Sequence, residues 1–181
     1  MTTFAKKGST VYTTETGKTW YAVYTKPRNE KKVYQRLQEK GIETFLPLQK
    51  KIKQWSDRKK MVEEPLFRSY IFVCISPKEY YDVLNTIGIV RYITFEGKAV
   101  AIPPRQIEQV KHLLVQDLEI ETVEQNLSPG DKVEVKFGQL MGIVGELVEH
   151  AGKKKLVIRI DHVSHSIMVT LPSDYIAKVI E

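Results

Sequence analysis

The stretch Glu64-Pro-Leu-Phe-Arg-Ser-Tyr-Ile-Phe-Val73 predicts a central β-strand that carries apolar side chains on both faces. Side chains alternate across a strand, so Ile71 and Val73 share one face while Tyr70 and Phe72 share the other. The segment Trp-Tyr-Ala-Val-Tyr-Thr at 20–25 repeats the pattern. Helices on one side of this sheet would cover only one of the two sets. The other set is then either an exposed protein-binding face or part of a core buried on both sides.

The segments around these strands predict an α+β domain. Apolar residues recur at helical spacing between Arg28 and Lys40, and Gly41 ends that helix. Further strands are expected at 42–48, 70–75 and 89–95, an exposed charged loop or ribbon at 50–60, and helices at about 77–86 and 103–114. This order predicts an antiparallel sheet with helices packed mainly on one face.

Past residue 127 the chain consists of short apolar runs separated by Gly, Asp, His and Pro. Strands are expected at 133–135, 143–148, 156–160, 167–171 and 176–179. Short strands joined by tight turns predict a small SH3-like β-barrel over 128–181. Gly138, Gly142 and Gly145 are expected where the backbone needs a positive φ or a close approach.

Composition shifts divide the chain into four parts. Residues 1–18 are rich in Thr, Ser, Lys and Gly and predict a flexible tail. Residues 19–114 form the predicted α+β domain. The segment 115–127 carries acidic residues and no basic ones, which predicts a linker before the barrel.

The overall composition limits the possible partners and compartments. The chain has 181 residues, a formal net charge of +6 and a pI near 9.2, which favours acidic partners such as nucleic acid. Cys74 is the one cysteine, so an internal disulfide is excluded. No apolar run approaches the roughly 20 residues that span a bilayer, and the first residues lack a signal-peptide core. We expect a soluble, cytoplasmic monomer.

Motifs for catalysis are missing from the sequence. It contains no Gly-rich phosphate loop and no nucleophile elbow. His162 and His165 have a spacing found in some metal sites, but no cysteine stands near them. We therefore expect a protein without enzymatic activity, metal or cofactor.

Two basic segments predict contact with nucleic acid, because lysine and arginine neutralise phosphates and an aromatic ring among them can stack on an unpaired base. The alternative is that each segment is only a solvated surface. The first candidate residues are Lys26, Lys32 and Arg36, and the second are Lys53, Trp55, Arg58 and Lys59.

Residues 20–32 and 64–73 resemble the N-terminal (NGN) domain of NusG-type transcription elongation factors. The segment Ser128-Pro-Gly-Asp-Lys-Val-Glu-Val135, followed by Gly142-Ile-Val-Gly145, resembles their KOW motif. The resemblance implies a factor whose aromatic sheet face binds the clamp helices of the largest catalytic RNA polymerase subunit, near upstream or non-template DNA. The residues at the matching positions of that face are Tyr24, Phe67, Tyr70, Phe72 and Tyr92.

The resemblance also implies partners for the small domain, which binds Rho or a small-subunit ribosomal protein in this family. The matching tip positions are Leu140, Ile143, His162 and Val163. Segments 26–32 and 54–60 are more similar to operon-specific paralogues of the RfaH and UpxY kind, which suppress pausing and termination over polysaccharide operons. Housekeeping NusG and a ribosome-associated or RNA-binding KOW protein are the alternatives. The β-branched and glycine-rich small domain favours a barrel over a helical alternative.

Overall fold

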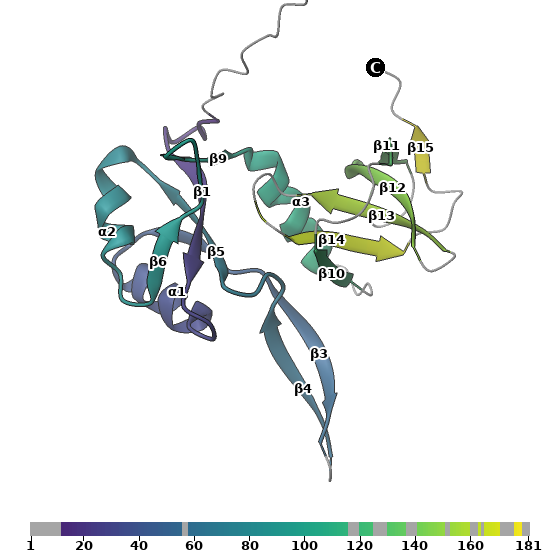
Figure 1. The fold of residues 1–181 in the computed structure, drawn as a ribbon, viewed down its shortest axis with the longest axis horizontal. Coiled ribbons are helices and arrows are strands. Elements are labelled where there is room, and N and C mark those ends of the chain that lie inside the picture. Colours follow the sequence, from purple (N-terminus) through teal and green to yellow (C-terminus); the bar gives the residue numbers. More distant parts are fainter. Residues whose placement is uncertain are drawn as a thin grey trace, which may run out of the picture.

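The computed structural model describes residues 12–55, 58–115, 120–124, 130–136, 141–150, 153–159, 163, 165–170 and 176–178. The N-terminal part is a five-stranded antiparallel sheet in which the order is β2-β5-β1-β6 and β9 also pairs with β1 (Figure 1). These strands are β1 (Thr19–Thr25), β2 (Glu43–Phe45), β5 (Tyr70–Ile75), β6 (Ile89–Tyr92) and β9 (Ala101–Ile102). The predicted strands at 20–25 and 70–75 are confirmed and lie side by side at its centre.

Helices cover both faces of this sheet. On one face α1 (Glu30–Glu39) and α2 (Tyr80–Leu84), which follows the short 3-10 turn η1 (Pro77–Glu79), bury Val33, Leu37 and Val83 against Val23 and Ile71. On the other face lies α3 (Pro104–Val115). Two of the three helices thus pack on one face, as predicted, but α3 covers the other face.

The reason is the apolar side of α3. Ile107, Val110 and Leu113 recur at three-residue spacing, so they form one stripe along the helix, and all three are fully buried. They join the sheet residues Trp20 and Phe72 in one cluster. Both apolar sets on the central strands are thus core, which is the second of the two alternatives open from the sequence.

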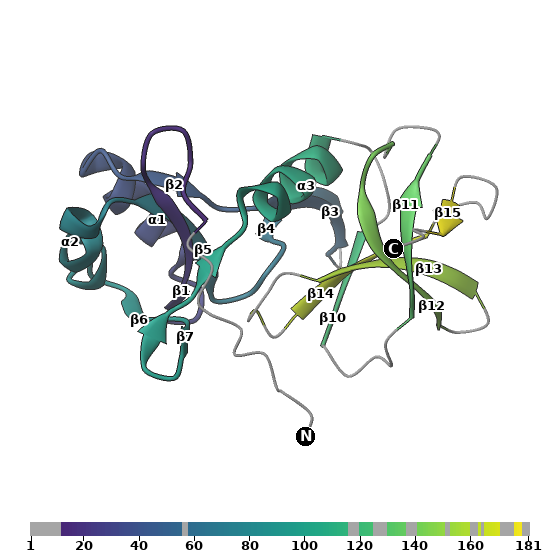
Figure 2. The ribbon, with the colours of Figure 1, turned by 90° about the horizontal axis from the view of Figure 1, so that it is seen from above.

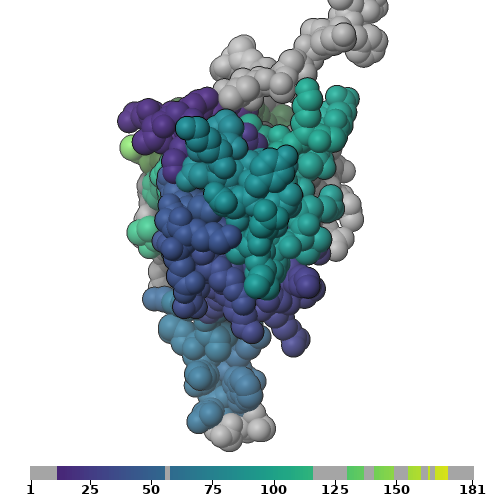
Figure 3. Space-filling view, turned by 90° about the vertical axis from the view of Figure 1, so that its left-hand side faces the viewer, coloured from purple at the N-terminus to yellow at the C-terminus, as the bar shows by residue number. Residues whose placement is uncertain are grey.

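A long two-stranded ribbon leaves the domain between β2 and β5. It is formed by β3 (Leu48–Gln54) and β4 (Lys59–Pro65), which pair only with each other among the described strands. Figures 1 and 3 show it extending away from the body of the domain. A smaller hairpin, β7 (Thr94–Phe95) with β8 (Lys98–Ala99), follows β6. The predicted ribbon at 50–60 is confirmed.

Two predicted strands are each divided. The run 42–48 becomes β2 and the start of β3, because Pro47 has no N–H for a ladder and its carbonyl instead accepts from the Leu66 N–H at 2.8 Å. The run 89–95 is divided at Ile93, whose N–H binds the Ala22 carbonyl at 2.9 Å while the chain turns into the β7–β8 hairpin.

The predicted tail 1–18 ends in a turn that packs on the domain. Thr13 forms a bridge with Thr19, and the Thr14 N–H binds the Lys18 carbonyl at 2.7 Å. The Lys18 ammonium lies 3.1 Å from Glu79. Residues 12–18 are therefore part of the folded domain.

The C-terminal part is an antiparallel sheet of six strands with the order β10-β14-β13-β12-β11-β15. They are β10 (Ile120–Glu124), β11 (Asp131–Val135), β12 (Val144–His150), β13 (Lys153–Arg159), β14 (His165–Thr170) and β15 (Ile176–Lys178). All five predicted strands are confirmed. β10 lies inside the predicted linker 115–127 and pairs with β14, so this part of the linker prediction is wrong.

Helix α3 stands between the sheet and the C-terminal strands (Figure 2). One cluster of buried side chains continues from the sheet through α3 to residues such as Val133, Ile143 and Leu156. The Gln109 side-chain amide also donates to the Val144 carbonyl at 3.3 Å, which joins α3 to β12. The aromatic side of the N-terminal sheet therefore faces the C-terminal domain across this helix.

Glu79 makes one part of the fold sensitive to acid. Its carboxylate accepts from the Ser76 N–H at 2.8 Å in a capping box and pairs with Lys18. The Ser76 hydrogen bonds and Lys18 lower the pKa of Glu79 below 4.5. A carboxyl whose pKa is lower when folded stabilises the protein above its unfolded pKa and loses this effect as pH falls through the folded value.

Glu79→Ala should therefore cost about 1 kcal/mol of unfolding free energy at pH 7. The difference from wild type should shrink as pH is lowered from 5 to 3, as measured by urea denaturation. Glu79→Gln retains the capping geometry and serves as the matched variant. A difference between wild type and the Ala variant that stayed constant over this range would show that the charge of Glu79 contributes nothing.

Candidate functional site

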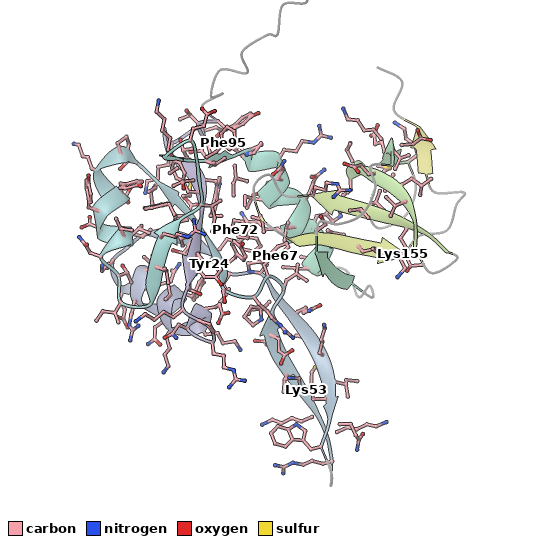
Figure 4. The ribbon with its side chains drawn as sticks, viewed as in Figure 1. Tyr24, Lys53, Phe67, Phe72, Phe95 and Lys155 are labelled. Carbon is pink, nitrogen blue, oxygen red and sulfur yellow. The ribbon has the colours of Figure 1, made fainter. Side chains whose placement is uncertain are left out.

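The aromatic cluster lies on the face of the sheet that meets α3 (Figure 4). It consists of Tyr24, Phe45, Phe67, Tyr70 and Phe72. The rings of Tyr24 and Tyr70 meet edge to face at 5.4 Å, and those of Phe67 and Phe72 do so at 5.9 Å. Phe45 stacks on Phe72 at 6.1 Å. The structure thus brings together four of the five residues predicted for the aromatic patch.

Most of the aromatic cluster is not accessible. Phe67 and Phe72 are 0% exposed and Tyr70 is 7% exposed, whereas Tyr24 is only partly buried. The Lys111 ammonium of α3 lies 5.5 Å from the Trp20 ring and 5.7 Å from the Phe45 ring. The prediction of an uncovered aromatic face is wrong, because α3 packs on it. Tyr24 and Phe45 are the partly buried members, and of these two only Tyr24 was predicted.

Tyr92 does not belong to the aromatic cluster. It lies opposite Val23 in the β1–β6 ladder and therefore on the face covered by α1 and α2. Its ring stacks on Tyr80 at 4.2 Å, and its hydroxyl donates to the Tyr80 carbonyl at 3.0 Å. Burial raises the pKa of Tyr92, so the phenol stays neutral. The prediction that Tyr92 forms one patch with Tyr24 and Tyr70 is therefore wrong.

Two loops with unusual backbone geometry hold the edge of the aromatic cluster. Arg28 and Ser69 both have a φ of 62°, in the left-handed region that side chains other than glycine rarely adopt. The Ser69 N–H donates to the buried Glu30 carboxylate at 2.7 Å, and its carbonyl accepts from the Thr25 N–H at 2.8 Å. These bonds tie the loop after β1 to the loop before β5.

Only part of the first predicted basic cluster is available to bind nucleic acid. Lys26 and Lys32 are exposed, as predicted. Arg36 instead donates to the Ile87 carbonyl at 2.6 Å and so links α1 to the turn after α2. Arg36 therefore has a structural contact, and its predicted role in binding nucleic acid remains untested.

The strand register divides the second basic cluster between the two faces of the ribbon. Lys53 lies opposite Lys60, and Ile52 lies opposite Met61. Alternation places Lys53 on the same face as Trp55, whose N–H binds the Arg58 carbonyl at 2.8 Å and extends the ladder by one pair. Lys59 lies opposite Gln54 and thus on the other face. The structure brings together three of the four predicted residues and separates Lys59 from them.

A basic pocket of about 650 Å³ lies at the base of the ribbon. The cationic residues that line it are Arg28, Lys31, Lys53 and Arg68, and the acidic ones are Glu30 and Glu64. Glu64 pairs with Lys53, and this hydrogen bond, with the charges of Lys51 and Arg68, lowers the pKa of Glu64. Arg28 and Lys31 belong to the first basic segment but were not singled out from it, and Arg68 was not predicted to bind nucleic acid, because only the fold brings these segments together.

The predicted tip of the C-terminal domain is mostly core or outside the described part. Ile143 is 2% exposed and Val163 is 0% exposed, so neither is available to a partner in this structure. Leu140 and His162 lie outside the described residues. Met141, which the sequence did not single out, is 65% exposed beside Gly142 with its positive φ of 86°.

The described residues carry no sign of two other kinds of site. No group of three or more His, Cys, Asp or Glu side chains gathers there in a way that could hold a metal ion. His162 lies outside them. No helix in the described ranges is long and apolar enough to cross a bilayer.

Burial and Glu43 raise the pKa of the Cys74 thiol to about 11, so it remains protonated at neutral pH.

Comparison with known proteins supplies the family. The sequence model described as transcription termination factor nusG matches residues 18–111. The chain belongs to the NusG family. It is 27% identical over 176 residues to the transcription termination/antitermination proteins NusG of Staphylococcus aureus and Staphylococcus epidermidis, which covers 90% of this chain and 96% of each relative. It is therefore a NusG-like transcription termination/antitermination factor and not an enzyme.

A solved structure supports the same fold. The structure described as domain interaction in Thermotoga maritima NusG aligns with a TM-score of 0.52 and 21% identity, over 90% of this chain and 98% of that one. The N-terminal sheet with its helices and the following antiparallel β domain are thus the NusG arrangement, as the sequence predicted.

Proposed function

We propose that this NusG-family protein binds RNA polymerase through its N-terminal domain and suppresses pausing or termination in the cytoplasm. The observation that supports this most strongly is the family match over 18–111, a range that contains the entire aromatic cluster. The part of RNA polymerase that this domain would bind is the clamp helices of the largest catalytic subunit. Binding that favours the closed clamp would reduce paused states as a population shift, with no chemical step.

The proposal gives different parts to the residues of the aromatic cluster. Tyr24 is the partly exposed ring among the predicted residues and would contact the polymerase directly. Phe67, Tyr70 and Phe72 are buried beneath it and would hold the Tyr24 ring in place. Partly exposed tyrosines backed by a packed apolar layer are common hot spots of protein interfaces.

The test compares binding of wild type and Tyr24→Ala to purified core RNA polymerase from the same organism. Loss of a hot-spot tyrosine should weaken binding by about 2 kcal/mol or more, which is roughly 30-fold. Tyr34→Ala is the matched control, because Tyr34 is 38% exposed on α1, away from the cluster. Equal binding by both variants would remove Tyr24 from the interface, and no binding by wild type would refute the proposal.

We further propose that the protein acts on specific operons, as RfaH- and UpxY-type paralogues do, rather than on most genes as housekeeping NusG does. The support is the sequence of segments 26–32 and 54–60, the second of which includes the ends of β3 and β4 in the projecting ribbon. Genome-wide mapping of the tagged protein on transcribed genes should show occupancy confined to a few long operons. Occupancy of most transcribed genes would identify a housekeeping factor.

The C-terminal domain would bind Rho or a small-subunit ribosomal protein, with Met141 as an exposed apolar contact residue. Met141→Glu should abolish this binding in a pull-down with each purified partner. Strong RNA binding by this domain, with no polymerase binding by the chain, would instead favour the ribosome-associated alternative.

A further inference from the structure

We propose that one face of the β3–β4 ribbon and the basic pocket at its base form a continuous track for a single strand of nucleic acid. The strand track is defined by Trp55, Arg58, Lys53, Lys60 and Lys51 on the ribbon, and by Arg28, Lys31 and Arg68 in the pocket. The inference rests on the proposed function in that the strand would come from a transcription complex. It concerns binding by the protein alone.

The ladder register shows that the ribbon residues of the track share a face. The pairs Lys51–Val62, Lys53–Lys60 and Gln49–Glu64 alternate with pairs that point the other way. The opposite face carries the apolar pair Ile52 and Met61, which are 68% and 62% exposed. Lys51, Lys53, Arg58 and Lys60 therefore share one face with the exposed tryptophan, whereas Lys50 and Lys59 lie beside the apolar pair on the other.

The same face leads directly into the pocket. Lys53 and Glu64 belong to this face by register, and both line the pocket together with Arg28, Lys31 and Arg68. Figure 4 shows Lys53 on the ribbon, between its tip and the N-terminal domain. Six residue positions separate Gln49, opposite Glu64, from Trp55, which corresponds to about 20 Å at about 3.3 Å per residue.

The chemistry along this path fits an unpaired strand better than a duplex. The Trp55 ring is 56% exposed at the tip, and an exposed aromatic ring can stack on a base only where that base is unpaired. The cations of the track can bind successive phosphates without reading sequence. A pocket of about 650 Å³ has the size that holds a small ligand or a nucleotide.

The two acidic residues of the pocket, Glu30 and Glu64, should affect the binding of a nucleic-acid strand differently. Glu30 is buried and its carboxylate accepts the Ser69 N–H, so it maintains the pocket wall. Glu64 pairs with Lys53 and holds this lysine back from a phosphate. A nucleic-acid strand in the track would compete with Glu64 for Lys53, so Glu64 should weaken the binding of that strand.

The experiment is fluorescence anisotropy with labelled single-stranded 12-mers of mixed sequence, as DNA and as RNA, and with the corresponding DNA duplex. We expect single strands to bind more tightly than the duplex. Trp55→Ala should weaken single-strand binding about tenfold. Lys60→Ala should weaken it more than Lys59→Ala, a matched change at the neighbouring position on the opposite face. Glu64→Gln should strengthen binding.

The salt dependence tests the pocket end of the track. Affinity falls as the salt concentration rises, and the Arg28→Ala/Arg68→Ala variant should make this dependence weaker. The slope of log affinity against log salt should become less negative by about 0.7 for each phosphate that the variant no longer neutralises. Equal effects of Lys59→Ala and Lys60→Ala, or duplex binding as tight as single-strand binding, would overturn the track. The DNA and RNA arms identify which strand it takes, and binding of either supports it. Polymerase binding is measured separately, so failure of the proposed function is distinguishable from failure of the track.

Discussion

Phe72→Ala should lower the free energy of unfolding by about 3–5 kcal/mol, because a fully buried phenylalanine leaves a cavity that its neighbours fill only in part. Phe72 is 0% exposed and contacts the rings of both Phe45 and Phe67. Urea denaturation followed by circular dichroism measures the change.

Phe95→Ala is the matched control, because the same substitution at a side chain that is 60% exposed should cost well under half as much. Similar losses for the two variants would show that the face under α3 is not packed as the structure describes. The result also affects the functional test. A loss of polymerase binding in Phe72→Ala would report damage to the core, so Tyr24 is the residue that tests the interface.

Gly130→Ala should destabilise the C-terminal domain by about 3 kcal/mol, at the upper end of the range for forcing extra volume into a packed site. A Cβ at Gly130 would lie 1.9 Å from the Leu147 carbonyl oxygen, and a backbone atom of a paired strand cannot move aside cheaply. Thermal unfolding of the variant, followed by the amide signals of β11 and β12, would measure the loss.

Gly142→Ala is the control for this substitution. A Cβ there meets nothing within 4 Å, so only the strain of its positive φ remains, which costs about 1 kcal/mol. If Gly130→Ala were as mild as Gly142→Ala, the close approach of residue 130 to β12 would not exist in solution.

Several features of the fold could be predicted because they depend on local patterns. Continuous runs of aromatic and β-branched residues at 20–25 and 70–75 predicted the two central strands, and short apolar runs between turn residues predicted the five later ones. The linker was harder. Its acidic residues favoured a linker, whereas β10 pairs with β14, a contact that lies far away in the sequence.

The candidate sites were less predictable than the fold. The sequence identified Tyr24, Tyr70 and Phe72 as neighbours, but it could not tell whether a helix covers them. It identified the charge of the ribbon and named Lys59 rather than Lys60 as a candidate, since the face of a residue depends on the register and on the position of the turn. Arg28 and Arg68 meet only because the loops at Arg28 and Ser69 are tied together through Glu30.

The sequence by itself determined the type and order of most elements and the NusG family, because propensity, turn residues and apolar periodicity act within a few residues of one another. The tertiary structure alone decided which faces are buried, that Tyr92 lies behind the sheet, and which cations share the strand track. These features depend on how α3 packs and how strands register over long separations. Such contacts are set by the free energy of the whole packed arrangement, and no short segment contains that information.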